Sequence, residues 1–241
     1  MLSTGPTDAP HNPHDSVAPR TSYDERVSEN RGRTRLRRAV LVALLVLAIL
    51  VLTVAAVVAL PILMHQSVGG SGQVPPTDFV AEASAEGADG RTRTLSVETA
   101  SGTPANLSSL REGDEFIVRG SGYDPGIGIY ISICAVPEQA GAKPTPCLGG
   151  VPEGAMQGEA AGSDEAASSA WVTDDWAWRA FATRGYDQDP PGSFEVRLLV
   201  PPPTQEGLDC TRQKCAVTTR ADHTASGDRV QDMQLPVAFA E

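Results

Sequence analysis

The longest apolar run in the chain covers residues 39–64 and holds 26 residues without a charge. About 20 apolar residues suffice to cross a hydrocarbon core of roughly 30 Å. Thr53 is the one hydroxyl-bearing residue of the run, so a helix over this segment has no polar face. The core helix of a soluble protein rarely needs an apolar surface on every side. The pattern therefore predicts a transmembrane helix over 39–64, with the lipid bilayer as its partner.

A cleaved signal peptide is the alternative for this segment. Its apolar region normally has about 7–15 residues and ends at a cleavage site made of small residues. Here the run is longer, 38 residues precede it, and residues 63–66 (LMHQ) lack the small side chains of such a site. The pattern favours an uncleaved, single-pass anchor.

Charges at the two ends of the apolar run predict its orientation. Five arginines lie just before it: Arg31, Arg33, Arg35, Arg37 and Arg38. Beyond residue 64, no Lys or Arg occurs until Arg91. Because cytoplasmic flanks carry the excess of positive charge, we expect residues 1–38 in the cytoplasm and the C-terminal part on the extracytoplasmic side of the cell membrane. Residues 1–38 are polar and rich in Pro, and they predict a disordered tail that ends in a basic juxtamembrane segment.

The hydrophobic pattern changes twice after the apolar run. Residues 65–91 are rich in Gly, Ser and Ala and predict a flexible linker. Residues 92–241 alternate between apolar and polar positions in short runs separated by Gly, Pro and Asp, which is typical of antiparallel strands. The predicted strands are 94–99, 115–119, 128–134, 169–173, 176–182, 193–200, 208–210, 216–219 and 234–240. Many short strands with turns between them predict a β-sandwich.

The net charge of -11 averages over two different regions. Residues 1–38 hold seven arginines against five acidic residues, a net charge of +2, so the rest of the chain carries -13. Abundant Ala, Arg, Asp and Gly with only two lysines indicate a GC-rich genome, such as that of an actinobacterium. Basic residues beside a transmembrane helix contact lipid headgroups. The glycines of 120–126 lack the spacing and the following helix of a nucleotide loop, so nucleic acid and nucleotides are not expected as partners.

All four cysteines lie on the side of the chain predicted to be exported, where disulfides persist: Cys134, Cys147, Cys210 and Cys215. Four cysteines allow three pairings. The simplest joins sequence neighbours, 134 with 147 and 210 with 215. A zinc site is the alternative, but neither pair has the Cys-x2-Cys spacing. We therefore expect two local disulfides and no metal or cofactor.

The segments around the cysteines resemble the neocarzinostatin family of actinobacterial proteins. The matching segments are 120–123 (GSGY), 133–135 (ICA), 208–210 (LDC) and 215–217 (CAV). The tail that starts at 220–224 (RADHT) is similar to the membrane-anchored, cell-surface version of this domain. The resemblance covers residues 92–241. It implies an immunoglobulin-like antiparallel β-sandwich with two local disulfides, and it implies binding of a small apolar or aromatic ligand.

Two groups of residues are candidates for contact with a partner or ligand. The aromatic group comprises Trp176, Trp178 and Tyr186; positions 176 and 178 share one face of a predicted strand. The tail group comprises Arg220, Asp222, His223, Asp228 and Arg229. The structural alternatives are core packing for the aromatic group and mutual bracing of charges for the tail group. A catalytic triad around His223 is a further alternative, which only geometry can establish.

These patterns together predict a noncatalytic envelope protein. Its exported β-sandwich is expected to bind a protein or an envelope component, for example as an accessory subunit of a membrane complex. Binding or carriage of a small apolar or aromatic ligand is the alternative that the resemblance implies. A hydrolytic enzyme is a second alternative, although no activated nucleophile, metal cluster or acid–base pair stands out.

Overall fold

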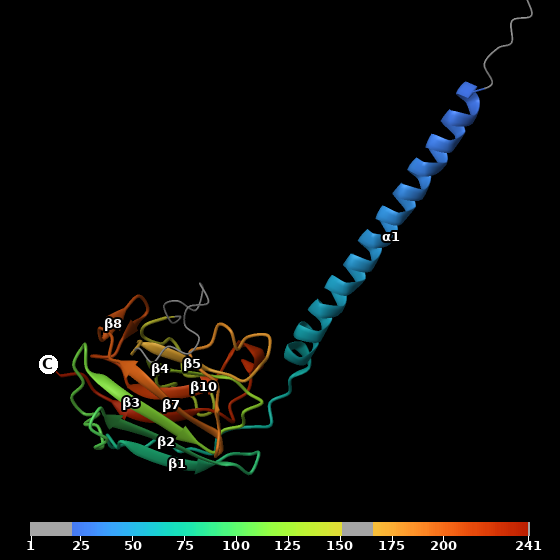
Figure 1. The fold of residues 1–241 in the computed structure, drawn as a ribbon. Helices are drawn as coiled ribbons and strands as arrows, with labels where there is room; N and C mark the ends of the chain where they lie inside the picture. The colour runs from blue at the N-terminus through green and yellow to red at the C-terminus, as the bar shows by residue number, and fades with distance from the viewer. Residues whose placement is uncertain (1–20, 151–165, 241) are drawn as a thin grey trace, which may run out of the picture. The chain divides into compact units, whose positions relative to one another are not determined.

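The computed structural model describes residues 21–150 and 166–240, with side chains described from residue 33 onward. Over these ranges the chain forms one long α-helix, a series of strands and one short 3-10 helix. It divides into two compact units, Met1–Val57 and Val58–Glu241 (Figure 1).

Helix α1 spans Thr21–Met64 and is longer than predicted. It begins well before Ala39, so residues 21–38 are helical and the prediction of a disordered tail fails for them. The reason is that adding residues to an existing helix costs far less than nucleating one, and Arg and Glu are good helix formers. The first part of the predicted tail, residues 1–20, lies outside the described residues.

The C-terminal part of α1 is long and apolar enough to cross a membrane, from Arg33 to Met64. Every side chain between Arg33 and Val57 is exposed, so this stretch contributes nothing to a protein core. The Thr53 hydroxyl donates to the Ile49 carbonyl oxygen at 2.8 Å. That bond satisfies the one polar side chain of the apolar run without water.

The β domain contains two main sheets in which all strand pairs are antiparallel (Figure 1). The five-stranded sheet has the order β1-β2-β3-β7-β6: β1 (Glu82–Glu86), β2 (Thr92–Thr99), β3 (Glu115–Ser121), β7 (Pro191–Leu199) and β6 (Asp187–Gln188). The four-stranded sheet has the order β11-β10-β4-β5: β11 (Met233–Val237), β10 (Cys215–Ala221), β4 (Ile129–Ala135) and β5 (Ser169–Val172). A third, small sheet pairs β8 (Thr204–Gln205) with β9 (Leu208–Asp209).

One hydrophobic core takes side chains from both main sheets. Alternate residues of each strand face it, including Leu95 and Val97 of β2 and Ile129, Ile131 and Ile133 of β4, all fully buried. This confirms the predicted period of two. Burying one such side chain contributes about 1.5–3 kcal/mol, so the shared core holds the two sheets together.

Residues 65–91 differ from the predicted flexible linker. Residues 82–86 form β1, which pairs with β2. The preceding residues, 65–80, lie against the β domain and are called the strap here. The Gln73 side-chain amide donates to the Gln234 carbonyl oxygen at 2.8 Å and accepts from the Gln234 N–H at 2.7 Å. These two bonds replace the strand partner that the free edge of β11 lacks, and this explains why a Gly- and Ser-rich segment is held in place.

The predicted strand over 176–182 is absent from the structure. Instead, the Trp178 and Arg179 N–H groups donate to the Asp175 carbonyl oxygen, at 3.1 and 2.8 Å. The Asp175 carboxylate also accepts from the Ala177 N–H at 2.8 Å. Asp side chains stabilise turns through such local bonds. Trp176 and Trp178 therefore do not share a strand face.

Both expected disulfides are formed, between Cys134 and Cys147 and between Cys210 and Cys215. No cysteine is left free. The first disulfide joins β4 to the loop that follows it, and the second closes the turn between β9 and β10.

Candidate binding surface

The face of the four-stranded sheet that points away from the core carries the chemically distinctive side chains. Tyr130 and Cys134 of β4 and Arg220 of β10 alternate with core residues, so they lie on this outer face. Ser132, between the first two on the same face, is only 3% exposed. Something therefore covers the middle of the outer face.

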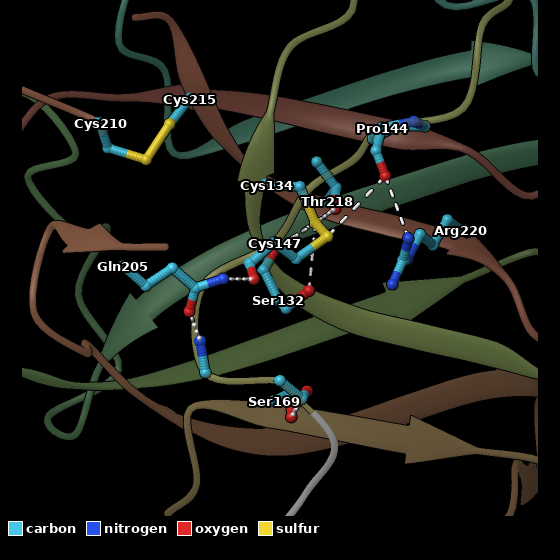
Figure 2. Close-up of a disulfide and its surroundings, with 12 residues drawn as sticks. Ser132, Cys134, Pro144, Cys147, Ser169, Gln205, Cys210, Cys215, Thr218 and Arg220 are labelled. Atoms are coloured by element: carbon cyan, nitrogen blue, oxygen red, sulfur yellow. Dashed lines mark hydrogen bonds between the residues drawn. A yellow bond between two sulfur atoms is a disulfide. The ribbon is translucent and has the colours of Figure 1, made fainter. Parts of the chain in front are cut away.

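The cover is the loop formed by residues 136–150. Cys147 ties it to β4 through the disulfide, and Arg220 Nη1 donates to the Pro144 carbonyl oxygen at 3.2 Å (Figure 2). On its other side, Gln205 Nε2 donates to the Cys147 carbonyl oxygen at 2.5 Å, while Gln205 Oε1 accepts from the Gly149 N–H at 3.1 Å. These contacts hold the loop over the centre of the sheet and leave its two flanks to form a surface.

On one flank, four rings form what is called here the aromatic cluster: Tyr130, Trp171, Trp178 and His223. Ring centroids lie 4.6 Å apart for Trp178 and His223, 5.3 Å for Trp171 and His223, and 5.6 Å for Tyr130 and Trp171. Such edge and tilted contacts are worth about 0.5–1.5 kcal/mol beyond buried area. The cluster is therefore a stiff platform.

Asp222 supports this platform from beneath and is fully buried. Its Oδ2 accepts from the Trp171 indole N–H at 2.9 Å, and its Oδ1 accepts from the Thr224 N–H and hydroxyl at 2.8 and 2.6 Å. At Gly128, a Cβ would collide with Oδ2 of this carboxylate. Asp222 is thus a structural acceptor whose side-chain partners are Trp171 and Thr224. No arginine pairs with it among the described residues; Arg229 pairs with Asp232 instead.

His223 is exposed, and its Nδ1 lies 2.9 Å from the Tyr130 hydroxyl. Burial raises the pKa of Tyr130 to about 12, so the hydroxyl stays protonated beside the imidazole. The Asp222 carboxylate is engaged elsewhere. Within the described residues, Asp222 and His223 therefore do not form the carboxylate–imidazole pair that a catalytic triad requires.

The structure separates the eight predicted contact residues into two sets. Trp176 is 69% exposed, His223 is exposed, and three others are half-buried: Trp178, Arg220 and Arg229. The remaining three are buried: Tyr186, Asp222 and Asp228. The Tyr186 hydroxyl donates to the Ile127 carbonyl oxygen at 2.8 Å, and Asp228 Oδ2 lies 2.9 Å from His65 Nε2 of the strap. These buried groups stabilise the fold and are not accessible to a partner.

Two members of the aromatic cluster, Tyr130 and Trp171, were not among the predicted contact residues. Both occupy outward positions of strands, opposite each other in the pairing of β4 with β5. The alternation of Tyr130 with buried isoleucines was the signal available in the sequence. The pairing of the two strands, which brings the rings together, was not.

On the other flank, a groove of about 480 Å³ lies between the strap and the turn closed by the second disulfide. It is called the strap groove. Its apolar lining includes the disulfide of Cys210 and Cys215 together with Pro75, Pro76, Phe79, Val136, Pro236, Val237 and Ala238. Arg212 and Lys214 also line it, and no acidic residue does.

A smaller pocket of about 190 Å³ lies beside this groove and is lined by Arg229, Asp232 and Gln234. Asp232 Oδ2 accepts from Arg229 Nη1 at 2.9 Å, which is the charge bracing expected for this tail. Asp232 Oδ1 has no hydrogen-bond partner among the described residues. Burial raises the pKa of Asp232 to about 7, although Arg229 opposes the shift.

The Asp232→Asn variant is expected to flatten the pH dependence of stability. In the wild type, the folded carboxyl holds its proton more tightly than the unfolded one, whose pKa is about 3.9. Stability therefore falls as the pH rises from about 4 to about 7 and is constant above that. Between pH 5 and 8 we expect the wild type to lose on the order of 2 kcal/mol more than the variant in denaturant unfolding. Parallel pH profiles of the two proteins would contradict this assignment.

The part of the chain that the structure describes has little metal-ligating geometry. No group of three or more His, Cys, Asp or Glu side chains is arranged there to hold a metal ion.

No protein-family model and no curated protein matches the chain. Among solved structures, macromomycin aligns with it at a TM-score of 0.32 and 17% sequence identity. The alignment covers 61% of this chain and 99% of macromomycin.

Proposed function

We propose that this protein is a noncatalytic, membrane-anchored binding module of the cell envelope. Helix α1 spans the cytoplasmic membrane, and the β domain lies on the extracytoplasmic side. There it binds a protein or another envelope component through Trp176 and the adjoining aromatic cluster. The observation that carries the proposal is the 69% exposure of Trp176 beside a stiff platform of packed rings.

The anchoring rests on length, composition and charge. The apolar stretch needs no protein partner in order to be buried in lipid, and its Thr53 hydroxyl is satisfied within the helix. Arginines precede the apolar run and no basic residue follows it closely, so the N-terminus is cytoplasmic. Both disulfides are stable only outside the reducing cytoplasm, in agreement with this orientation.

The domain type proposed is an immunoglobulin-like sandwich of the neocarzinostatin kind in an actinobacterial surface protein. In chain order, β2, β3, β6 and β7 correspond to strands A, B, D and E, which form one sheet of such a sandwich. Likewise β4, β10 and β11 correspond to strands C, F and G of the other sheet. Strand order, the two local disulfides and the motifs around the cysteines support this assignment.

Exposure makes the Trp176 side chain available to a partner. Burial of a large aromatic side chain against a partner lowers the free energy, and tryptophan is enriched among the residues that dominate binding energies. Trp178, two residues away, packs against His223 and so restrains the turn that carries Trp176. A restrained anchor loses little entropy on binding.

Replacement of Trp176 by Ala is expected to reduce recovery of the bound partner by about tenfold or more, since central tryptophans contribute about 2 kcal/mol or more. The measurement is affinity purification of tagged full-length protein from native membranes after mild crosslinking, followed by quantitative mass spectrometry. Phe79→Ala is the matched control, because Phe79 is also an exposed aromatic residue but lines the strap groove. If Trp176→Ala and Phe79→Ala co-purify the same proteins and envelope components as the wild type, or if the wild type purifies alone, the proposal is overturned.

A further inference from the structure

The strap groove has the form of a ligand site. Its volume of about 480 Å³ falls within the roughly 300–1,000 Å³ of ligand pockets. Its lining combines Pro75, Pro76 and Phe79 of the strap with Pro236 and Val237 of β11. Proline walls lose little conformational freedom on binding, so the groove is preformed.

Anchoring of the strap wall is independent of any ligand. The paired hydrogen bonds of Gln73 with the Gln234 backbone lie two residues before Pro75 and fix the strap at the edge of β11. The Cys210–Cys215 disulfide closes a turn whose residues also line the groove. The strap and this turn are therefore held by hydrogen bonds and by a covalent bond, respectively.

The charges around the groove select the head group of an occupant. Arg212 and Lys214 are exposed on its rim, and they are the only charged residues among those that line it. This is a local reversal of sign, because the chain beyond residue 38 carries a net charge of -13. An anion is attracted to this rim, while its apolar body is accommodated by the proline and phenylalanine walls.

The size of the groove limits the occupant to one chain. At roughly 30 Å³ for each water-sized group, about 480 Å³ holds about 16 such groups. A carboxylate with a chain of about twelve carbons matches this space, whereas a lipid with two long acyl chains exceeds it.

We infer that the strap groove binds a single-chain amphiphile with an anionic head group, of the class of medium-chain fatty carboxylates. The apolar chain lies between the strap and β11, and the head group pairs with Arg212 and Lys214. This goes beyond the partner contact proposed for Trp176, which lies among a different set of residues.

The test uses full-length protein in phosphatidylcholine nanodiscs and a dodecanoate that carries a photoactivatable diazirine on its chain. After irradiation, mass spectrometry of peptides maps the labelled residues. We expect labelling of segments 75–79 and 234–238, and we expect unlabelled dodecanoate to compete. Labelling confined to helix α1 would show partition into lipid alone and would overturn the inference.

Variants separate the charge from the apolar walls. Arg212→Glu combined with Lys214→Glu should reduce groove labelling by about three- to tenfold, since two exposed ion pairs are lost and replaced by repulsion. Arg111→Glu is the matched control, because Arg111 is exposed but does not line the groove. Thr77→Trp, at an exposed strap position on the groove wall, should block labelling by filling the space.

The neutral analogue, a diazirine-bearing dodecanol, completes the test. We expect it to label the groove several-fold less than the carboxylate does. Equal labelling by the two probes, or labelling that the Arg212/Lys214 double variant leaves unchanged, would overturn the assignment of an anionic ligand. Trp176→Ala should leave groove labelling unchanged, so failure of this inference is distinguishable from failure of the partner proposal.

Discussion

Replacement of Asp89 by Ala is expected to destabilise the β domain by about 3–5 kcal/mol, because it leaves a buried charge without its partner. Arg93 is fully buried, and its Nη1 and Nη2 donate to the Asp89 carboxylate at 2.9 and 2.5 Å. Its Nε donates to Gln231 Oε1 at 2.7 Å, which joins the five-stranded sheet to the segment before β11. Guanidinium denaturation followed by tryptophan fluorescence measures the effect, since all three tryptophans lie in this domain.

Two control variants interpret that result. Asp78→Ala removes an exposed carboxylate nearby in sequence and should change stability by less than about 0.5 kcal/mol. Asp89→Asn keeps a hydrogen-bond acceptor but removes the charge, so its free energy of unfolding should lie between those of Asp89→Ala and Asp78→Ala. If Asp89→Ala unfolds at the same denaturant concentration as Asp78→Ala, the pairing of Arg93 with Asp89 does not contribute to the stability of the domain.

The same pair has a pH signature. Hydrogen bonds from the Arg93 guanidinium hold the pKa of Asp89 below its usual value. The stabilisation is therefore present above about pH 4, the unfolded value, and is lost as the pH falls through the lower folded pKa. Acid unfolding of the wild type should be steeper over this range than that of Asp89→Asn.

Removal of the Cys134–Cys147 disulfide, by replacing both cysteines with Ser, is expected to cost about 3 kcal/mol in the chain-entropy model for a loop of this size. The disulfide also holds the 136–150 loop over the outer face of the sheet, where Arg220 contacts Pro144. Thermal and denaturant unfolding of the full-length variant, with intact-mass analysis of thiols, measure the loss.

The second disulfide supplies the comparison. Cys210 and Cys215 are separated by 5 positions, against 13 for the first pair. The shorter loop predicts a smaller loss, about 2 kcal/mol, when both are replaced by Ser. A larger loss for this pair than for Cys134 and Cys147 would show that local packing, and not loop closure, governs the stability that each bond contributes.

Hydrophobic patterning was sufficient for the main strands. The alternation of Ile129, Ile131 and Ile133 with polar neighbours predicted β4, and Phe194, Val196 and Leu198 predicted β7 in the same way. These predictions are confirmed because one face of each strand is buried in a shared core, which imposes a period of two on the sequence.

Patterning failed where hydrogen bonds outweighed side-chain periodicity. The aromatic residues of 176–181 favoured a strand, but Asp175 captures the following N–H groups in a turn. The composition of the strap favoured a flexible linker, but one glutamine side chain, Gln73, pairs with the open edge of β11. Asp175 is adjacent in the sequence, but the turn it forms outweighs the strand preference of the aromatic residues; the partner of Gln73 lies 161 positions along the chain and cannot be read from a local window.

Local sequence was enough to predict the apolar helix, the antiparallel strands and, as the simplest of three pairings, the two local disulfides, since each depends on residues close together in the chain. Which candidate residues reach the surface depends instead on how distant segments pack together. Buried hydrogen bonds engage the side chains of Tyr186, Asp222 and Asp228, whereas the Trp176 side chain is exposed. The aromatic cluster and the strap groove likewise exist only because β4, β5, β10, β11 and the strap lie together in space. The exposure of a side chain and its distance from another depend on packing between segments far apart in the chain, so a local stretch of sequence cannot predict them.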